Sequence, residues 1–291
     1  MSGQAKRTGP LFLRSRKTTA VAKNILVYVL LCIAAIVFLI PFFWMVTSAV
    51  KTQQQIFKYP IEWIPNPAVW SNFLEVWRAI PFGMFFKNSL IVSSLVIVGD
   101  LVASTLVAYG FARKDFPGKN VLFLLLLGTM MIPQQVTLIP LFILYRTLGW
   151  IDTFKPLIVP SYLGNAFFIF MLRQFFLTIP AELEEAALLD GCGSLRIFTS
   201  IFLPLSKPAL VTVGIFSFMN SWNDFFLPLI YLNSIENKTL ALGLSLFKGE
   251  YATEWGLLMA ASVQVILPCL VLFFSTQKYF VEGIALTGIK G

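Results

Sequence analysis

The feature that most constrains this chain is a succession of apolar runs, each long enough to cross a lipid bilayer. An α-helix needs about 20 predominantly apolar residues to cross the hydrocarbon core. We expect spans at 25–50, 88–111, 121–145, 156–172, 207–232 and 256–276. Only 12% of the 291 residues are charged, whereas a soluble domain carries roughly 25% charged residues. The sequence therefore predicts an all-α polytopic membrane protein with six transmembrane helices.

The lysines and arginines between the runs predict which side of the membrane each loop occupies. Positive residues are enriched in cytoplasmic loops. If the N-terminus is inside, segments 1–23, 113–120, 173–207 and 278–291 are cytoplasmic, and they hold 14 of the 22 Lys and Arg residues. We therefore expect both termini in the cytoplasm. We divide the chain into a basic N-terminus, 1–23, and one transmembrane domain, 24–291.

Several classes of function are disfavoured by what the composition lacks. The chain has no His and three widely spaced Cys, so neither a metal site nor a disulfide is indicated. Gly118-Lys119-Asn120 lacks the upstream glycine and the following Ser or Thr of a phosphate loop. No basic face with base-stacking residues points to nucleic acid, and no nucleophile or acid pair points to an enzyme.

Prolines and aromatic residues predict local structure outside the regular spans. Pro133 and Pro140 lie inside the third apolar run, where we expect the helix to kink or break. The aromatic segment 51–87 reads as a structured external loop with a short interfacial helix around 70–79.

The segment 173–207 is a polar, acid-rich interruption between two spans. Pro180 and three glutamates favour a helix start, and Gly191 favours a helix end, so a short helix is expected at about 180–190. A second is expected at about 195–202, capped by Ser194 and stopped by Pro204. On the first helix Leu183, Ala186, Ala187 and Asp190 share a face, where the alanines permit close approach of another element.

Two acids fall inside the predicted spans. Asp224, Asn220 and Asn223 are spaced to share one face of the fifth span, close to Pro228, and Asp100 lies in the second span. Ionisable groups at membrane depth usually face the bundle interior or a wet cavity. These four residues are our candidate transport path. The alternative is hydrogen bonding between helices within the bundle.

The polar segment carries a recognisable spacing. Glu185-Ala186-Ala187, Gly191 and Ile201-x-Leu203-Pro204 fit the pattern EAA-x3-G-x9-I-x-LP. This resembles the EAA loop of ABC-importer permease subunits. The rest of the chain is similar to the MalG-like carbohydrate permeases at 108–113, 116–118, 131–133, 220–225 and 287–291. Cys192 and Ile289 are small departures from that pattern.

The resemblance implies a type I ABC-importer permease fold in a bacterial or archaeal cytoplasmic membrane. Its coupling loop is 180–204 and its C-terminal tail is 279–291. It implies contact with an ATPase subunit through Glu184, Glu185, Ala186, Ala187, Asp190, Gly191, Ile201, Leu203, Pro204, Thr287, Gly288 and Lys290. The implied partners are a second homologous permease, a dimer of ATP-binding subunits, an extracytoplasmic solute-binding protein, a saccharide and membrane lipid.

The expected function is binding-protein-dependent import of sugars or oligosaccharides by alternating access. No cofactor is expected in this chain, because ATP and Mg²⁺ would be bound by the partner ATPase. The alternative is an ion-coupled secondary transporter that uses Asp100 and Asp224 as ion sites. Such a transporter is expected to show inverted repeats with paired broken helices, and the sequence shows no clear repeat.

Overall fold

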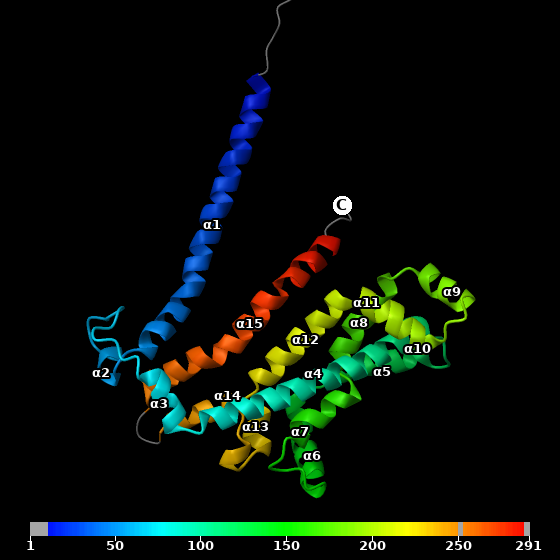
Figure 1. Ribbon diagram of the computed structural model, residues 1–291. Helices are drawn as coiled ribbons and strands as arrows, with labels where there is room; N and C mark the ends of the chain where they lie inside the picture. The colour runs from blue at the N-terminus through cyan, green and yellow to red at the C-terminus, as the bar shows by residue number, and fades with distance from the viewer. Residues whose placement is uncertain (1–10, 250–252, 288–291) are drawn as a thin grey trace, which may run out of the picture.

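The computed structural model describes residues 11–249 and 253–287 (Figure 1). Within these ranges the fold is helical, and the β pairing described there is one isolated bridge between Lys248 and Thr253. The α-helices are α1 (Leu11–Ala49), α2 (Gln53–Ile56), α3 (Asn72–Ala79), α4 (Phe82–Arg113), α5 (Lys119–Thr129), α6 (Gln134–Thr147), α7 (Lys155–Ile158), α8 (Ala166–Thr178), α9 (Ala181–Leu189), α10 (Ser194–Ile197), α11 (Leu203–Leu205), α12 (Lys207–Trp222), α13 (Phe226–Tyr231), α14 (Leu240–Gly243) and α15 (Trp255–Thr287). Shorter 3-10 or π segments are η1 (Val159–Leu163), η2 (Phe198–Phe202), η3 (Ile235–Asn237) and η4 (Leu244–Phe247).

Four stretches of the described chain are long and apolar enough to cross a membrane. They are Lys23–Ala49, Phe82–Arg113, Lys155–Thr178 and Trp255–Lys278. Two helix pairs pass the same test together but bend at a short break, α5 with α6 by 94° and Ser194–Leu205 with α12 by 78°. The chain is thus an all-α polytopic membrane protein with four candidate spans, or up to six if each bent pair is one span.

The long helix α4 is the element around which the others pack. It lies against α8, α12, η1 and α14, and it extends from the α3 end of the molecule to the α5 and α10 end (Figure 1). Gly99 lies where α4 meets η1, and a Cβ added there would come 2.3 Å from Ser161 Oγ. The missing side chain therefore permits this close helix contact.

Two apolar clusters occupy the two ends of α4. One joins the end of α4 to α8, α9 and the start of α12, with Phe176 and Phe202 fully buried. The other joins the start of α4 to α1, α3, α14 and α15, and includes Phe82 and Phe85. Because lipid tails are as apolar as these side chains, the clusters stabilise the bundle through close van der Waals packing. The middle of α4, between the clusters, borders the cavity described below.

The third predicted span breaks near its first proline, as expected. α5 ends at Thr129, Pro133 immediately precedes α6, and Pro140 lies inside α6. A proline has no N–H to donate and disfavours helical backbone in the residue before it, which explains the break.

The fourth predicted span, 156–172, is confirmed as the candidate span Lys155–Thr178, but it is not one regular helix. It consists of α7, η1 and α8, and it continues to Thr178. The interruption lies at Gly164, whose φ is +91°, and Asn165, whose side-chain oxygen accepts a hydrogen bond from Phe167 N at 3.0 Å. Glycine supplies the left-handed backbone and Asn caps the new helix. Arg173 does not end the helix.

The fifth predicted span, 207–232, was also wrong as one helix. α12 ends at Trp222 and α13 begins at Phe226. Asp224 Oδ1 accepts hydrogen bonds from Phe226 N at 3.0 Å and Leu227 N at 3.1 Å. A side-chain oxygen that binds the first free N–H groups starts a helix. The break therefore precedes Pro228, which is buried within α13.

Other boundaries moved without changing the architecture. α4 begins at Phe82, six residues before the predicted 88, and α15 extends to Thr287 instead of 276. Residues 82–86 are mostly apolar themselves, and lysine is a good helix former, so Lys87 and Lys278 do not end the helices. The short helix predicted around 70–79 is confirmed as α3, and its external location stays a prediction.

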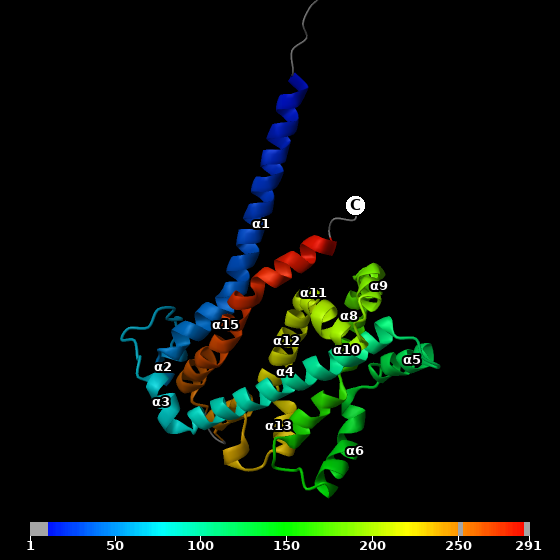
Figure 2. The ribbon, with the colours of Figure 1, turned by 45° about the vertical axis from the view of Figure 1, so that its right-hand side comes forward.

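Helix α1 stands apart from the bundle over most of its length (Figures 1 and 2). The side chains of 23–43 are all exposed, and only the C-terminal part of the helix lies beside α15. α15 is the main intrachain contact of α1 among the described elements.

Candidate functional site

Helix α9 projects from the end of the molecule where α4 ends (Figures 1 and 2). It spans Ala181–Leu189, with Pro180 as its N-cap, within one residue of the predicted 180–190. Gly191 has a φ of +77°, and Cys192 N donates to Ala187 O at 2.9 Å. This is the left-handed C-terminal turn that glycine favours, so the predicted role of Gly191 in ending the helix is confirmed.

The predicted contact residues of α9 divide between two faces. Glu185, Ala186, Asp190 and Gly191 are exposed. Ala187 is only 9% exposed and packs in the apolar cluster at the end of α4. Its own chain therefore covers Ala187, so the two alanines do not share one exposed face. The ATPase contacts assigned to both stay predictions.

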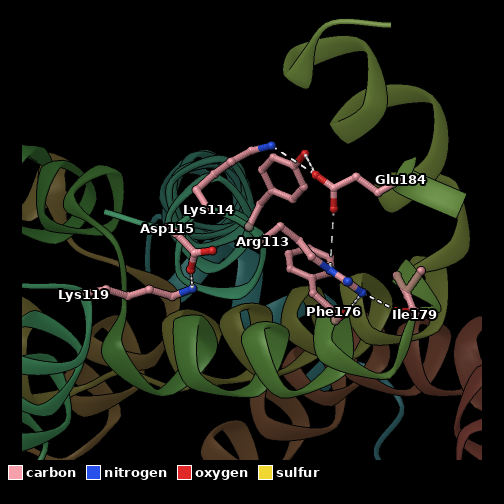
Figure 3. Close-up of polar contacts among 8 residues, drawn as sticks. Arg113, Lys114, Asp115, Lys119, Phe176, Ile179 and Glu184 are labelled. Atoms are coloured by element: carbon pink, nitrogen blue, oxygen red, sulfur yellow. Dashed lines mark hydrogen bonds and ion pairs between the residues drawn. The ribbon is translucent and has the colours of Figure 1, made fainter. Parts of the chain in front are cut away.

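Glu184 faces inward and lies between two cations (Figure 3). Its Oε1 accepts a hydrogen bond from Lys114 Nζ at 3.1 Å, and its Oε2 lies 4.0 Å from Arg113 Nε. The Tyr109 hydroxyl donates to Oε1 at 3.4 Å. The carboxylate side chain is 12% exposed. These contacts tie α9 to the C-terminal end of α4.

Arg113 extends the same attachment to α8. Its Nη2 donates to Phe176 O at 2.7 Å and also to Ile179 O (Figure 3). These carbonyls are at the end of α8, where free acceptors and the helix dipole favour a cation. The guanidinium also lies over the Phe202 ring, 4.9 Å from its centre. Arg113 thus joins the ends of α4 and α8, η2 and α9.

The charge of Lys114 responds to this arrangement. Partial burial by itself lowers the pKa of the Lys114 ammonium, but hydrogen bonds with Glu184 and Tyr109 and the nearby negative charge outweigh that effect. The pKa of Lys114 therefore lies above its ordinary value of 10.5. Lys114 remains protonated throughout the neutral range.

The second short helix differs from the prediction. Gly193, not Ser194, is the N-cap, and helical backbone runs through η2 to Leu205 instead of stopping before Pro204. The π segment η2 places Leu203 N on Phe198 O, five residues back. A local π turn changes the hydrogen-bond register and so accommodates Pro204, which has no N–H.

The remaining predicted contact residues lie around this turn or near the C-terminus. Ile201 and Leu203 pack partly buried against the cluster at the end of α4, and Pro204 is exposed. Thr287 is described only as the last residue of α15. Gly288 and Lys290 lie outside the described residues. The ATPase contacts assigned to all these residues stay predictions.

A cavity of about 810 Å³ lies beside the middle of α4. This volume is within the roughly 300–1,000 Å³ typical of small-molecule sites. Three interruptions of the helices reach it, at Met130, at Gly164 and at Asp224. Irregular backbone at membrane depth is tolerated where it lines a polar space. The broken helices and the cavity are therefore one feature.

Three of the four predicted path residues line this cavity. They are Asp100, Asn220 and Asp224. Asp100 is 5% exposed, and its Oδ2 accepts a hydrogen bond from Ser217 Oγ at 2.7 Å. Asn223 is not among the lining residues, and its amide donates to Met219 O at 2.8 Å. The shared helical face that we predicted was wrong, because the helix ends at Trp222.

Sequence reasoning missed most of the uncharged polar side chains of the cavity. They are Thr129, Gln134, Ser161, Asn165, Ser217, Ser221 and Thr239. Gln134 and Asn165 each follow a helix-breaking residue, Pro133 or Gly164. A polar residue next to a breaker inside an apolar run was the available signal.

Comparisons with known proteins bear on these features. A family model described as "Binding-protein-dependent transport system inner membrane component" matches residues 101–285. "Probable ABC transporter permease protein YurM" of Bacillus subtilis (strain 168) is 38% identical over 270 residues, covering 91% of this chain and 88% of the relative. "Arabinooligosaccharides transport system permease protein AraQ" of the same organism is 36% identical over 261 residues, covering 88% and 92%.

Two further likenesses extend the comparison. "sn-glycerol-3-phosphate transport system permease protein UgpE" of Yersinia pestis is 32% identical over 269 residues, covering 90% of this chain and 95% of the relative. A chain in the crystal structure of a bacterial ABC transporter involved in the import of the acidic polysaccharide alginate superposes with a TM-score of 0.79. It is 24% identical, and the match covers 94% of this chain and 100% of that one. This last likeness concerns the fold.

Proposed function

Because the chain belongs to the family of inner-membrane components of binding-protein-dependent transport systems, we propose that it is the permease subunit of an ATP-driven saccharide importer. The cytoplasmic membrane is its location, and solute passage is its role. In this proposal ATP and Mg²⁺ are bound by a separate ATPase subunit. A second permease and an external solute-binding protein complete the transporter.

The observation that carries the proposal is the outward face of α9. Leu188 is 52% and Leu189 is 89% exposed, beside the exposed Glu185 and Asp190. A projecting helix that combines exposed apolar and acidic side chains outside the apolar spans is a docking surface for another protein. The family membership supports an ATPase subunit as that protein.

The attachment of α9 to α4 supports a route for movement. Arg113 and Lys114 hold Glu184 at one end of α4, and Asp100 lies on the same helix beside the cavity. A helix behaves as a rigid element over this length. In our proposal, displacement of α9 by the ATPase is therefore passed along α4 to the cavity, which opens to one side and then the other.

The cavity supports a polyhydroxylated solute. Its wall mixes Asp, Asn, Gln, Ser and Thr side chains with apolar ones, which provides both donors and acceptors for hydroxyl groups. The name of AraQ, for arabinooligosaccharides, refers to a solute of this kind. A saccharide or related polyol is thus the solute class we assign to this chain.

Uptake by the assembled transporter tests the proposal. The chain is co-purified with its ATPase, second permease and binding protein, placed in proteoliposomes, and supplied with a panel of labelled oligosaccharides. We expect uptake that requires ATP and the binding protein. Uptake by this chain alone, driven by a proton or sodium gradient without ATP, would instead support a secondary transporter and contradict the proposal.

A further inference from the structure

The cavity beside α4 has an uneven charge distribution. Its ionisable lining residues are Asp100 and Asp224, and no Lys or Arg is among the described residues that line it. The acids come from two elements, α4 and the break between α12 and α13. The part of the wall that the structure describes therefore carries two acids and no positively charged side chain.

Each acid retains one carboxylate oxygen that the protein does not use. Asp100 Oδ2 is bound by Ser217 and Asp224 Oδ1 by two backbone N–H groups. Among the described residues, Asp100 Oδ1 and Asp224 Oδ2 have no hydrogen-bond donor. A carboxylate oxygen accepts hydrogen bonds only, so these atoms match a solute that carries O–H groups.

Thr239 is a further uncharged polar residue in the wall of the cavity. It lines the same cavity, is 4% exposed, and its Oγ1 has no hydrogen-bond partner in the described chain. Buried hydroxyl groups are nearly always paired with protein or an ordered polar molecule.

From these observations we infer that Asp100 and Asp224 are specificity-determining residues, which admit uncharged polyhydroxylated solutes to the cavity and exclude anionic ones. This inference rests on the proposed function, because it takes the cavity as the solute passage. An anion entering here exchanges its hydration for a wall without cations and meets negative charge. A neutral sugar loses less hydration and donates its hydroxyl protons to the open carboxylate oxygens.

At Asp224 the negative charge can be removed without loss of the hydrogen bonds that start α13. Its capping of α13 uses Oδ1 alone. Asparagine also has an Oδ1 that accepts hydrogen bonds, and it is among the best N-cap residues. Asp224→Asn therefore removes the negative charge while it preserves the helix start. The same substitution at Asp100 retains an acceptor for Ser217.

Reaction of an introduced thiol measures the charge of the cavity directly. Cys32, Cys192 and Cys269 are replaced by Ser or Ala, and Asn220→Cys places one thiol in the cavity wall of the assembled transporter. Modification rates are compared for methanethiosulfonate reagents that are neutral, cationic and anionic. For the thiol in the cavity, the cationic reagent should react faster than the anionic one. We expect this ratio of rates to be about tenfold or more above the same ratio measured with 2-mercaptoethanol, a small thiol free in solution.

The Asp224→Asn variant is the matched comparison. It is expected to shift the ratio of rates at the introduced thiol toward that of 2-mercaptoethanol while the neutral reagent reacts as before. A ratio equal to that of 2-mercaptoethanol, a ratio unchanged by Asp224→Asn, or a thiol closed to the neutral reagent overturns the inference.

Uptake separates this inference from the proposed function. Proteoliposomes are offered a transported neutral oligosaccharide and its counterpart oxidised at C6 to a uronic acid. We expect preferential uptake of the neutral sugar, and a several-fold rise in the acid-to-neutral ratio for Asp224→Asn. Equal uptake of both by the unaltered transporter rejects the charge selection but keeps the importer. Absence of ATP-dependent uptake of any sugar rejects the importer.

Discussion

Glu184 on α9 and Asp224 beside the cavity are both acidic, but they differ in what surrounds them. Glu184 has Lys114 at 3.1 Å, Arg113 at 4.0 Å and a tyrosine hydroxyl as partners. Asp224 has backbone N–H groups on one oxygen and no described partner on the other. A carboxylate that is fully compensated within its own chain fixes structure, whereas an uncompensated one remains available to a ligand.

Arg113→Ala is the largest perturbation of the compensated region. It removes donors from the end of α8 and a cation from Glu184, and the Arg113 side chain is only 11% exposed. Loss of one partner from a largely buried charge pair is strongly destabilising, and we expect about 3 kcal/mol. Thermal unfolding in detergent measures it.

Arg78→Ala is the control for that measurement. Arg78 is 77% exposed and its ion pair with Glu75 is 3.8 Å long, so we expect less than about 0.5 kcal/mol. Equal destabilisation by the two variants would show that Arg113 does not hold the helix ends together.

Glu185→Lys probes the outward face of α9, one residue from the compensated carboxylate. Glu185 is exposed and has no described ion pair within its chain, so folding should be unchanged. Reversal of charge at a docking surface should weaken co-purification of the ATPase about tenfold or more. Glu236→Lys, exposed at the other end of the molecule, should leave it unchanged. A stable complex containing Glu185→Lys argues against α9 as the docking helix.

Glu184→Gln and Asp100→Asn each remove a carboxylate charge while the side chain keeps its shape. They compare an acid that is paired with cations and an acid that is not. We expect Glu184→Gln to cost about 1 kcal/mol of stability and to lower ATP-dependent uptake, because the attachment of α9 to α4 weakens. Asp100→Asn should cost less than about 0.5 kcal/mol, because it leaves no cation unpaired. Paired unfolding and uptake measurements check both. The opposite order of the two stability changes contradicts the distinction between them.

Asp152 is another carboxylate with partners in its own chain, and its smaller effect on stability is expected to depend on pH. Its carboxylate is bound by the Ser234 hydroxyl and backbone N–H, with Asn233 N at 2.9 Å, and these hydrogen bonds lower its pKa from 3.8 to about 2. Because the folded-state pKa is depressed, the stabilisation is present above pH 3.8 and is lost as the pH falls toward 2.

The measurement for Asp152 is a melting temperature as a function of pH. Asp152→Asn should lower stability by about 0.7 kcal/mol at pH 7. The difference between the variant and the unaltered chain should shrink between pH 4 and pH 2. A difference that stays constant over this range would mean that the carboxylate charge contributes nothing there.

The sequence predicted those features that local backbone chemistry determines. Gly191 ends α9, and Pro133 breaks the third span, because glycine and proline restrict the backbone wherever they occur. The break after Trp222 has neither residue. Asp224 causes this break by capping the helix that follows it. From sequence alone, an aspartate in an apolar run is equally consistent with a residue of the transport path and with a helix cap.

The sequence could not predict which residues of α9 face the rest of the chain and which are exposed. Ala186 and Ala187 are chemically identical, yet one is exposed and the other is buried by its own chain. Glu184 and Glu185 are likewise adjacent and alike. Glu184 turns inward toward Tyr109, Arg113 and Lys114, about 70 residues earlier, and such tertiary contacts have no local signal in the sequence.

The isolation of α1 has a consequence for how the chain is made. Its main intrachain contact among the described elements is α15, which begins at Trp255, long after α1 ends at Ala49. Translation proceeds at about 5–20 residues per second, so the intervening stretch of roughly 200 residues delays that contact by about 10–40 seconds. During this interval α1 must be stable in the lipid by itself. Its long, uninterrupted apolar surface therefore serves an intermediate of biogenesis as well as the finished bundle.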